Sequence, residues 1–193
     1  MIICCFGDSL TLGVGDSSGL GWPGRLAQRL GADLTKTTLY NLGVRADTSV
    51  RLGQRWMAEA LARSNNATDT RLVFCVGTAD VAQHVPPKDS TRACTDILRR
   101  SGEVGSHLLI TPPPMADPDK NARLGALAAQ FRTVTERHGA ACFDLFSALV
   151  ENRTYRHALE RGDGVHPDDR GHELLAATLA SWPPLAALFL GSS

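Results

Sequence analysis

The two ends of the chain carry the three residue types that nucleophilic hydrolysis requires. Ser9 follows the apolar run Met1-Ile2-Ile3-Cys4-Cys5 closely, where we expect the mouth of a strand, and His166 follows Asp163 by three positions. A serine hydroxyl attacks a carbonyl carbon when an imidazole takes its proton and a carboxylate orients that imidazole. Ser9, His166 and Asp163 are therefore the candidate nucleophile, base and acid.

A metal-dependent hydrolase is a second interpretation of the same C-terminal segment. Carboxylates and imidazoles are ligands that zinc accepts. Such a site would use Asp163, His166, Asp168, Asp169 and His172. These residues show no recognisable ligand spacing, and capping of a helix by Asp168 or Asp169 is a simpler explanation. We expect neither a metal nor a cofactor.

Length and composition limit the class of protein. The chain has 193 residues, of which 43% are hydrophobic and 21% charged, and its formal net charge is zero. These values are typical of one soluble domain over residues 1–193. The balanced charge argues against nucleic acid or an anionic membrane as a partner. We expect a small-molecule substrate and no stable membrane association, and the sequence does not indicate an oligomeric state.

The cysteines suggest the compartment. There are five, an odd number that cannot pair completely within the chain, and four of them lie in short apolar runs. A free thiol in such a run behaves as a small hydrophobic side chain. We therefore expect reduced, structural cysteines and a cytoplasmic protein, with no leader before the first strand.

Short apolar runs alternate with helical patterns along the chain. We predict strands at residues 2–7, 39–42, 72–76, 108–110 and 141–145. We predict helices at residues 25–34, 51–63, 90–100, 121–138 and 168–181. Continuously apolar strands separated by helices predict an α/β fold whose parallel sheet is covered on both faces. Reactive groups then gather at the carboxyl ends of the strands, where Ser9 and Gly43 lie.

A tetrahedral intermediate also needs hydrogen-bond donors for its oxyanion. Gly43, in Asn41-Leu42-Gly43, can present its backbone N–H without side-chain obstruction. The N–H of Ser9 is a second natural donor. We predict that these two groups form the oxyanion hole.

Four blocks of this sequence resemble the SGNH hydrolases, also called the GDSL esterase/lipase family. They are Gly7-Asp8-Ser9-Leu10, Asn41-Leu42-Gly43 with Asp47-Thr48, Gly77-Thr78-Ala79-Asp80, and Asp163 to His166. They occur in the family's order and extend over the whole chain. The resemblance implies a flavodoxin-like, three-layer α/β/α fold with a five-stranded parallel sheet. It also implies hydrolysis of esters or thioesters without a cofactor, and we expect small acyl groups because no lid-like insertion is visible.

One position departs from the family. The third block normally reads Gly-x-Asn-Asp, and its asparagine amide is an oxyanion donor, but here that position is Ala79. Loss of one such donor typically costs about 3–4 kcal/mol of transition-state stabilisation. Ala79 could be an engineered substitution, another group could replace the amide, or the domain could bind ligands with little catalysis.

Arg45 is the candidate replacement for that amide. It lies two residues beyond Gly43, and a guanidinium stabilises an oxyanion strongly in a dry site. The alternative is a surface salt bridge with Asp47 or a neighbouring acid.

Overall fold

A five-stranded parallel sheet forms the centre of the computed structural model, which describes residues 1–64 and 69–191. The strand order is β2-β1-β3-β4-β5, which is the flavodoxin-like order. The strands are β1 Ile2–Gly7, β2 Thr38–Gly43, β3 Thr70–Cys75, β4 Ser106–Ile110 and β5 Ala141–Phe143. The predicted three-layer α/β/α fold is confirmed. Residues 65–68 and 192–193 of the predicted domain lie outside the described residues.

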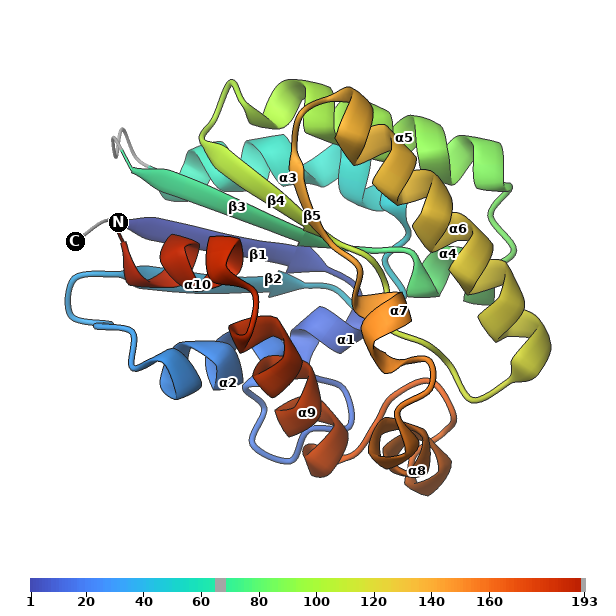
Figure 1. The fold of residues 1–193 in the computed structure, drawn as a ribbon. Coiled ribbons are helices and arrows are strands. Elements are labelled where there is room, and N and C mark those ends of the chain that lie inside the picture. Colours follow the sequence, from blue (N-terminus) through green and yellow to red (C-terminus); the bar gives the residue numbers. More distant parts are fainter. Residues whose placement is uncertain (65–68, 192–193) are drawn as a thin grey trace.

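Helices cover both faces of the sheet (Figure 1). One face carries α2 Gly21–Leu30, α9 Asp169–Ala180 and α10 Pro183–Leu190, and the other carries α3 Ser49–Ser64, α5 Pro87–Ser101 and α6 Pro118–Arg137. Successive strand residues face opposite sides. In β1, Ile3 and Cys5 therefore join the core under α2 and α9, while Cys4 and Phe6 join the core under α3 and α5. This two-sided burial explains why the strands are apolar without alternation.

The longer helices match their predicted positions, with one clear error at α2. That helix begins at Gly21, before the predicted start at residue 25, and ends at Leu30 instead of residue 34. Gly31 ends it by adopting a left-handed conformation, φ 64°, and donating its N–H to Ala27 and Gln28. The predicted strand 141–145 also ends early, because Asp144 caps the following helix.

Among the described residues, five further helices were not predicted. They are α1 Ser9–Leu12, α4 Thr78–Ala82, α7 Leu145–Leu149, α8 Arg153–Arg161 and α10. The first three have four or five residues, too few to show a helical period, so tertiary contacts must stabilise them. The start of α8 does carry a sequence signal, since Asn152 accepts a hydrogen bond from the Tyr155 N–H as a helix cap.

The five cysteines are free thiols. Cys4, Cys5, Cys75 and Cys94 are buried, and Cys142 is half-buried. Burial raises the pKa of the Cys4 thiol to about 11 and holds that of Cys5 well above its ordinary value. These thiols are therefore protonated at neutral pH and serve as packing groups.

Within residues 1–64 and 69–191, no single helix has the length and apolar composition needed to cross a membrane. The pair α9 and α10 meets both criteria only when taken together, and the two helices are bent by 93° from each other. Leu175 and Leu179 of α9 and Leu185 of α10 are buried in the core.

The three neighbouring strands β2, β1 and β3 end at the same edge of the sheet. Gly7, the last residue of β1, is paired with Gly43 of β2 and Cys75 of β3. The segments that follow these residues therefore begin side by side. This edge is where the predicted site residues meet.

Candidate active site

A continuous hydrogen-bonded relay joins Ser9, His166 and Asp163. Ser9 Oγ lies 2.7 Å from His166 Nε2, across 157 positions of sequence. His166 Nδ1 lies 2.7 Å from Asp163 Oδ2. The His166 side chain is 14% exposed, whereas that of Asp163 is 59% exposed. The structure thus brings the three residues together in the order that a nucleophile, a base and an orienting acid require.

The start of α1 fixes Ser9 at the end of β1. Asp8 caps this helix, and its Oδ1 accepts a hydrogen bond from the Leu10 N–H at 2.9 Å. Ser9 is the first helical residue. First-turn N–H groups have no partner within a helix, and the Ser9 N–H has no acceptor among the described residues. It remains available to a ligand.

A tight turn holds the Asp163 carboxylate against His166. Its Oδ1 accepts hydrogen bonds from the backbone N–H groups of Val165 and His166, while Oδ2 meets the imidazole. Partial burial raises the pKa of Asp163, but the hydrogen bonds from His166 and Val165 outweigh it and lower this pKa to about 2. The carboxylate is ionised at neutral pH, so it favours the proton on Nδ1 and leaves Nε2 to accept the Ser9 proton.

A cavity of about 180 Å³ opens beside Ser9. Side chains from four segments border it, and these segments follow β1, β2 and β3 or precede α9. The lining residues are Ser9, Arg45, Ala46, Thr78, Ala79, Ala82, Gln83, Val165 and His166. Arg45 and Ala79 therefore lie where the sequence analysis expects them, and Gly43 does not border the cavity.

The prediction that Gly43 supplies an oxyanion donor is wrong. Its N–H donates to Asn41 Oδ1 at 3.1 Å and is not available to a substrate. Gly43 is the last residue of β2, and a Cβ there would lie 2.2 Å from the backbone N of Leu12. This glycine is needed because β2 packs directly against the backbone of α1.

Ala46 takes the position that was expected of Gly43. It borders the cavity, and its N–H has no acceptor among the described residues. Its φ is 59°, in the left-handed region that is uncommon for residues other than glycine. An alanine carries no sequence signal of that conformation, so sequence reasoning missed it. Ser9 and Ala46 thus both border the cavity, and each has a backbone N–H without an acceptor in the described chain.

Gln83 holds the peptide of Ala46 in place. Its Nε2 donates to the Ala46 carbonyl oxygen at 2.6 Å, and Arg51 Nη1 makes a longer contact to the same oxygen at 3.4 Å. Gln83 lies four positions after Ala79, at the C-terminal end of α4. That spacing places both residues on one face of a helical turn and is the signal that could have revealed Gln83.

Arg45 and Ala79 differ in what they offer the cavity. Arg45 is exposed and makes no hydrogen bond or ion pair within the described part of the chain. The alternative of an Arg45–Asp47 salt bridge is wrong, because Asp47 pairs with Arg55 at 2.7 Å. Ala79 is 5% exposed and provides no side-chain donor.

The side chains considered for a metal site face separate partners. Asp168 caps α9 and pairs with Arg161, Asp169 accepts hydrogen bonds from Ser17, and His172 Nε2 meets the Val14 carbonyl. Of that set, only Asp163 contacts His166. The described residues contain no cluster of three or more His, Cys, Asp or Glu side chains arranged to hold a metal ion.

Comparison with known proteins identifies the family of this chain. The model of the GDSL-like Lipase/Acylhydrolase family matches residues 5–174. The chain belongs to this family. As a member of it, the protein is a carboxylic ester hydrolase. It is 31% identical to GDSL lipase Rv0518 of Mycobacterium tuberculosis over an aligned length of 199 residues, and the alignment covers 92% of this chain and 79% of that protein.

Two solved structures show the shared fold of this family member. Axe2, an acetylxylan esterase from Geobacillus stearothermophilus, superposes with a TM-score of 0.77 at 19% identity, covering 100% of this chain and 97% of that one. LAE5, an alpha/beta hydrolase from the metagenome of Lake Arreo, Spain, gives a TM-score of 0.70 at 21% identity, covering 98% and 96%.

Asp8 is a buried carboxyl group that joins two parts of the site. Besides capping α1, its Oδ2 lies 3.4 Å from the Ala79 N–H of α4. Burial raises the pKa of Asp8 to about 7, although hydrogen bonds from Leu10 and Ala79 favour the ionised form. The folded state therefore binds this proton more tightly than the unfolded chain does.

The substitution Asp8→Asn should flatten the pH dependence of stability. The stabilising effect of the raised pKa is complete below about pH 4 and is lost as pH rises through about 7. Relative to Asp8→Asn, the native chain should lose on the order of a few kcal/mol of unfolding free energy between pH 4 and pH 8. Urea unfolding of both proteins at several pH values measures this difference. A difference that does not change with pH would contradict it.

The substitution Gln83→Ala should lower kcat for an ester by about tenfold or more and change KM little, because a displaced Ala46 N–H no longer meets the oxyanion. Gln83→Glu should lose as much, since a carboxylate cannot donate to the Ala46 carbonyl. Gln54→Ala, an exposed residue of α3, is the matched control. Equal kcat in all four proteins would show that Gln83 has no positioning role.

Proposed function

We propose that this chain hydrolyses small acyl esters or thioesters through an acyl-enzyme formed on Ser9. The observation that carries the proposal is the relay from Ser9 Oγ through His166 to Asp163, with 2.7 Å at each contact. Ser9 Oγ bonds to the acyl carbon while its proton passes to His166 Nε2. His166 then gives that proton to the leaving atom, the oxygen of an alcohol or the sulfur of a thiol. Water next attacks the acyl carbon while His166 takes its proton. The acid leaves Ser9 as His166 returns the proton to Ser9 Oγ.

Backbone donors stabilise the oxyanion in this proposal. The N–H groups of Ser9 and Ala46 border the same cavity without protein acceptors in the described chain. Two preorganised donors at the oxyanion stabilise a tetrahedral intermediate substantially. Arg45 borders the cavity without an acidic partner in the described chain, which supports its role as a third donor in place of the absent amide at Ala79.

The dimensions of the cavity favour a small acyl group. Its volume is about 180 Å³, and the methyl groups of Ala46, Ala79 and Ala82 form part of its wall with Val165. Small apolar side chains suit an acetyl or similarly short chain. An acetylxylan esterase and a lipase occur among the related proteins, and acetyl esters are the substrates we propose to test first.

Covalent labelling separates an active hydrolase from an inert domain of the same fold. We expect a fluorophosphonate probe to modify the native chain at Ser9, because His166 removes the hydroxyl proton during the attack. Ser9→Ala should abolish labelling, and His166→Ala should slow it by at least about 10³-fold. Intact-protein mass spectrometry with peptide mapping measures the adduct. A native chain that remains unlabelled would support the catalytically weakened binding domain instead.

The substitution Ala79→Asn restores the family asparagine and tests whether another group already replaces its amide. If the donor set is incomplete, Ala79→Asn should raise kcat on p-nitrophenyl acetate, by up to the order of 10²–10³-fold. If Arg45 already replaces the amide, Ala79→Asn should gain little, and Arg45→Ala should lower turnover more than ester affinity. Steady-state kinetics of the two variants and the double variant distinguish these cases. Unchanged turnover in Arg45→Ala would remove Arg45 from the mechanism.

A further inference from the structure

Thr78 is a polar side chain of the cavity beside Ser9 that the proposed hydrolysis leaves without a role. The other polar side chains of that cavity are accounted for. Ser9 Oγ bonds to His166 Nε2, and Gln83 donates to a backbone carbonyl. Arg45 is exposed to solvent. Thr78 is only 3% exposed, so packing holds its side chain in place, and a buried hydroxyl needs a contact that satisfies it.

The Thr78 hydroxyl has no hydrogen-bond partner among the described residues. It is not one of the unpartnered oxygens that lack accessible surface, so it is open to the cavity that Thr78 lines. The position of Thr78 in its helix explains why the hydroxyl is free. A threonine hydroxyl within a helix can bond to the carbonyl four residues earlier. Thr78 is the first residue of α4, and Phe74, four residues earlier, lies in β3.

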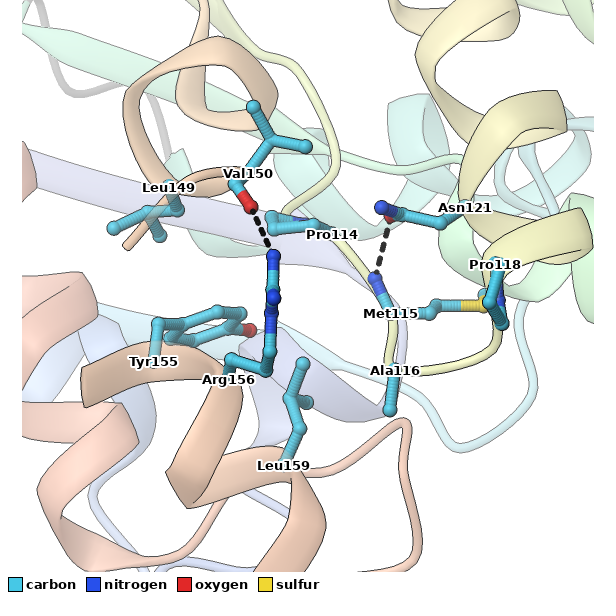
Figure 2. Close-up of a pocket in the computed structure, with 10 residues that line it drawn as sticks. All are labelled: Pro114, Met115, Ala116, Pro118, Asn121, Leu149, Val150, Tyr155, Arg156 and Leu159. Atoms are coloured by element: carbon cyan, nitrogen blue, oxygen red, sulfur yellow. Dashed lines mark hydrogen bonds between the residues drawn. The ribbon is translucent and has the colours of Figure 1, made fainter. Parts of the chain in front are cut away.

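Within the described chain, the cavity shown in Figure 2 offers no hydroxyl that could serve a ligand in the same way. It has a volume of about 250 Å³ and lies between α8, the end of α7 and the loop after β4. The Tyr155 hydroxyl is closed off from it, because that oxygen has no accessible surface. Arg156 is exposed and makes a 3.5 Å contact to the Val150 carbonyl. The Thr78 hydroxyl is therefore better placed to meet a ligand.

Thr78 adjoins the position at which the family carries its donor amide. Ala79 follows it directly and lines the same cavity, where it provides only a methyl group. The first turn of α4 is tied to the helix of the nucleophile, because Asp8 Oδ2 lies 3.4 Å from the Ala79 N–H. A β-branched side chain has few rotamers, so the oxygen of Thr78 is positioned before a substrate arrives. An oxyanion is stabilised by preorganised donors of this kind.

We propose that the Thr78 hydroxyl donates a hydrogen bond to the substrate oxyanion, beside the N–H groups of Ser9 and Ala46. This inference rests on the proposed attack by Ser9. Negative charge develops on the carbonyl oxygen as the bond from Ser9 Oγ to the acyl carbon forms, and again when water attacks that carbon. The Thr78 proton stays on its own oxygen in both steps. Thr78 is a neutral and buried donor, whereas Arg45 acts from an exposed position through its charge, so the two contributions can be measured separately.

The substitution Thr78→Val tests this role, because valine has nearly the shape of threonine and lacks the hydroxyl. We expect kcat on p-nitrophenyl acetate to fall by about tenfold or more, with KM within about twofold of the native value, because the hydrogen bond strengthens in the transition state. Thr78→Ser keeps the hydroxyl and should retain kcat to within about threefold. Steady-state kinetics of the three proteins measure these values.

Thr154→Val is the matched control, since Thr154 is an exposed threonine in the first turn of α8 that does not line the cavity. Its kcat should equal that of the native chain. The melting temperature of each variant shows whether it is folded. If Thr78→Val does not fold, Thr78→Ser is compared with Thr78→Ala, which also lacks the hydroxyl. The serine variant should then have a kcat about tenfold or more above that of the alanine variant.

Labelling of the native chain with the fluorophosphonate probe distinguishes failure of this inference from failure of the proposed hydrolysis. If Ser9 is labelled and the ester is hydrolysed, equal kcat in Thr78→Val and the native chain would overturn the role of Thr78 alone. An equal loss in Thr78→Val and Thr78→Ser would overturn it too, because serine keeps the donor. If the native chain is neither labelled nor active, the proposed hydrolysis is wrong, and the role of Thr78 with it.

Discussion

The 2.7 Å contact between Ser9 Oγ and His166 Nε2 requires two distant segments to be held at fixed positions. The loop after α1 and the start of α9 provide this constraint. Asp169 accepts hydrogen bonds from Ser17, and His172 Nε2 meets the Val14 carbonyl. A Cβ at Gly15 would lie 2.3 Å from the Pro167 carbonyl oxygen, so the two backbones touch beside the histidine. These contacts lie outside the relay of Ser9, His166 and Asp163, yet they fix the position of the His166 imidazole.

The oxyanion side of the site is built from backbone geometry. Ala46 adopts a left-handed conformation that costs a non-glycine residue on the order of 1 kcal/mol, and the Gln83 amide holds its carbonyl. Ala79 occupies the position where the family carries a donor amide, and it contributes only a methyl group. In the proposed mechanism, peptide N–H groups and Arg45 take the place of the side-chain amide that the family carries at this position.

Asp8 links the helix that carries Ser9 to the helix that carries Ala79. Its carboxyl group is buried beneath the site, caps α1 and reaches the Ala79 N–H of α4. Burial favours its neutral form, in contrast to Asp163, whose hydrogen bonds keep it ionised. Two carboxyl groups within one site thus have pKa values shifted in opposite directions because their surroundings differ. The exposed one can orient an imidazolium, and the buried one is structural.

The alternation of apolar strand segments with helical segments in the sequence alone determined the layered fold, since strands that are apolar on both faces need helices to cover both faces. It also singled out Ser9, Asp163 and His166, because each residue type carries its own chemistry. Tertiary structure decided which backbone N–H groups remain free. The Gly43 N–H is bonded to the Asn41 side chain, which is itself held by the Thr11 carbonyl of α1, and the Ala46 peptide is held by Gln83 of another element. Backbone donors are identical in every residue but proline, so only the assembled chain distinguishes a free N–H from a paired one.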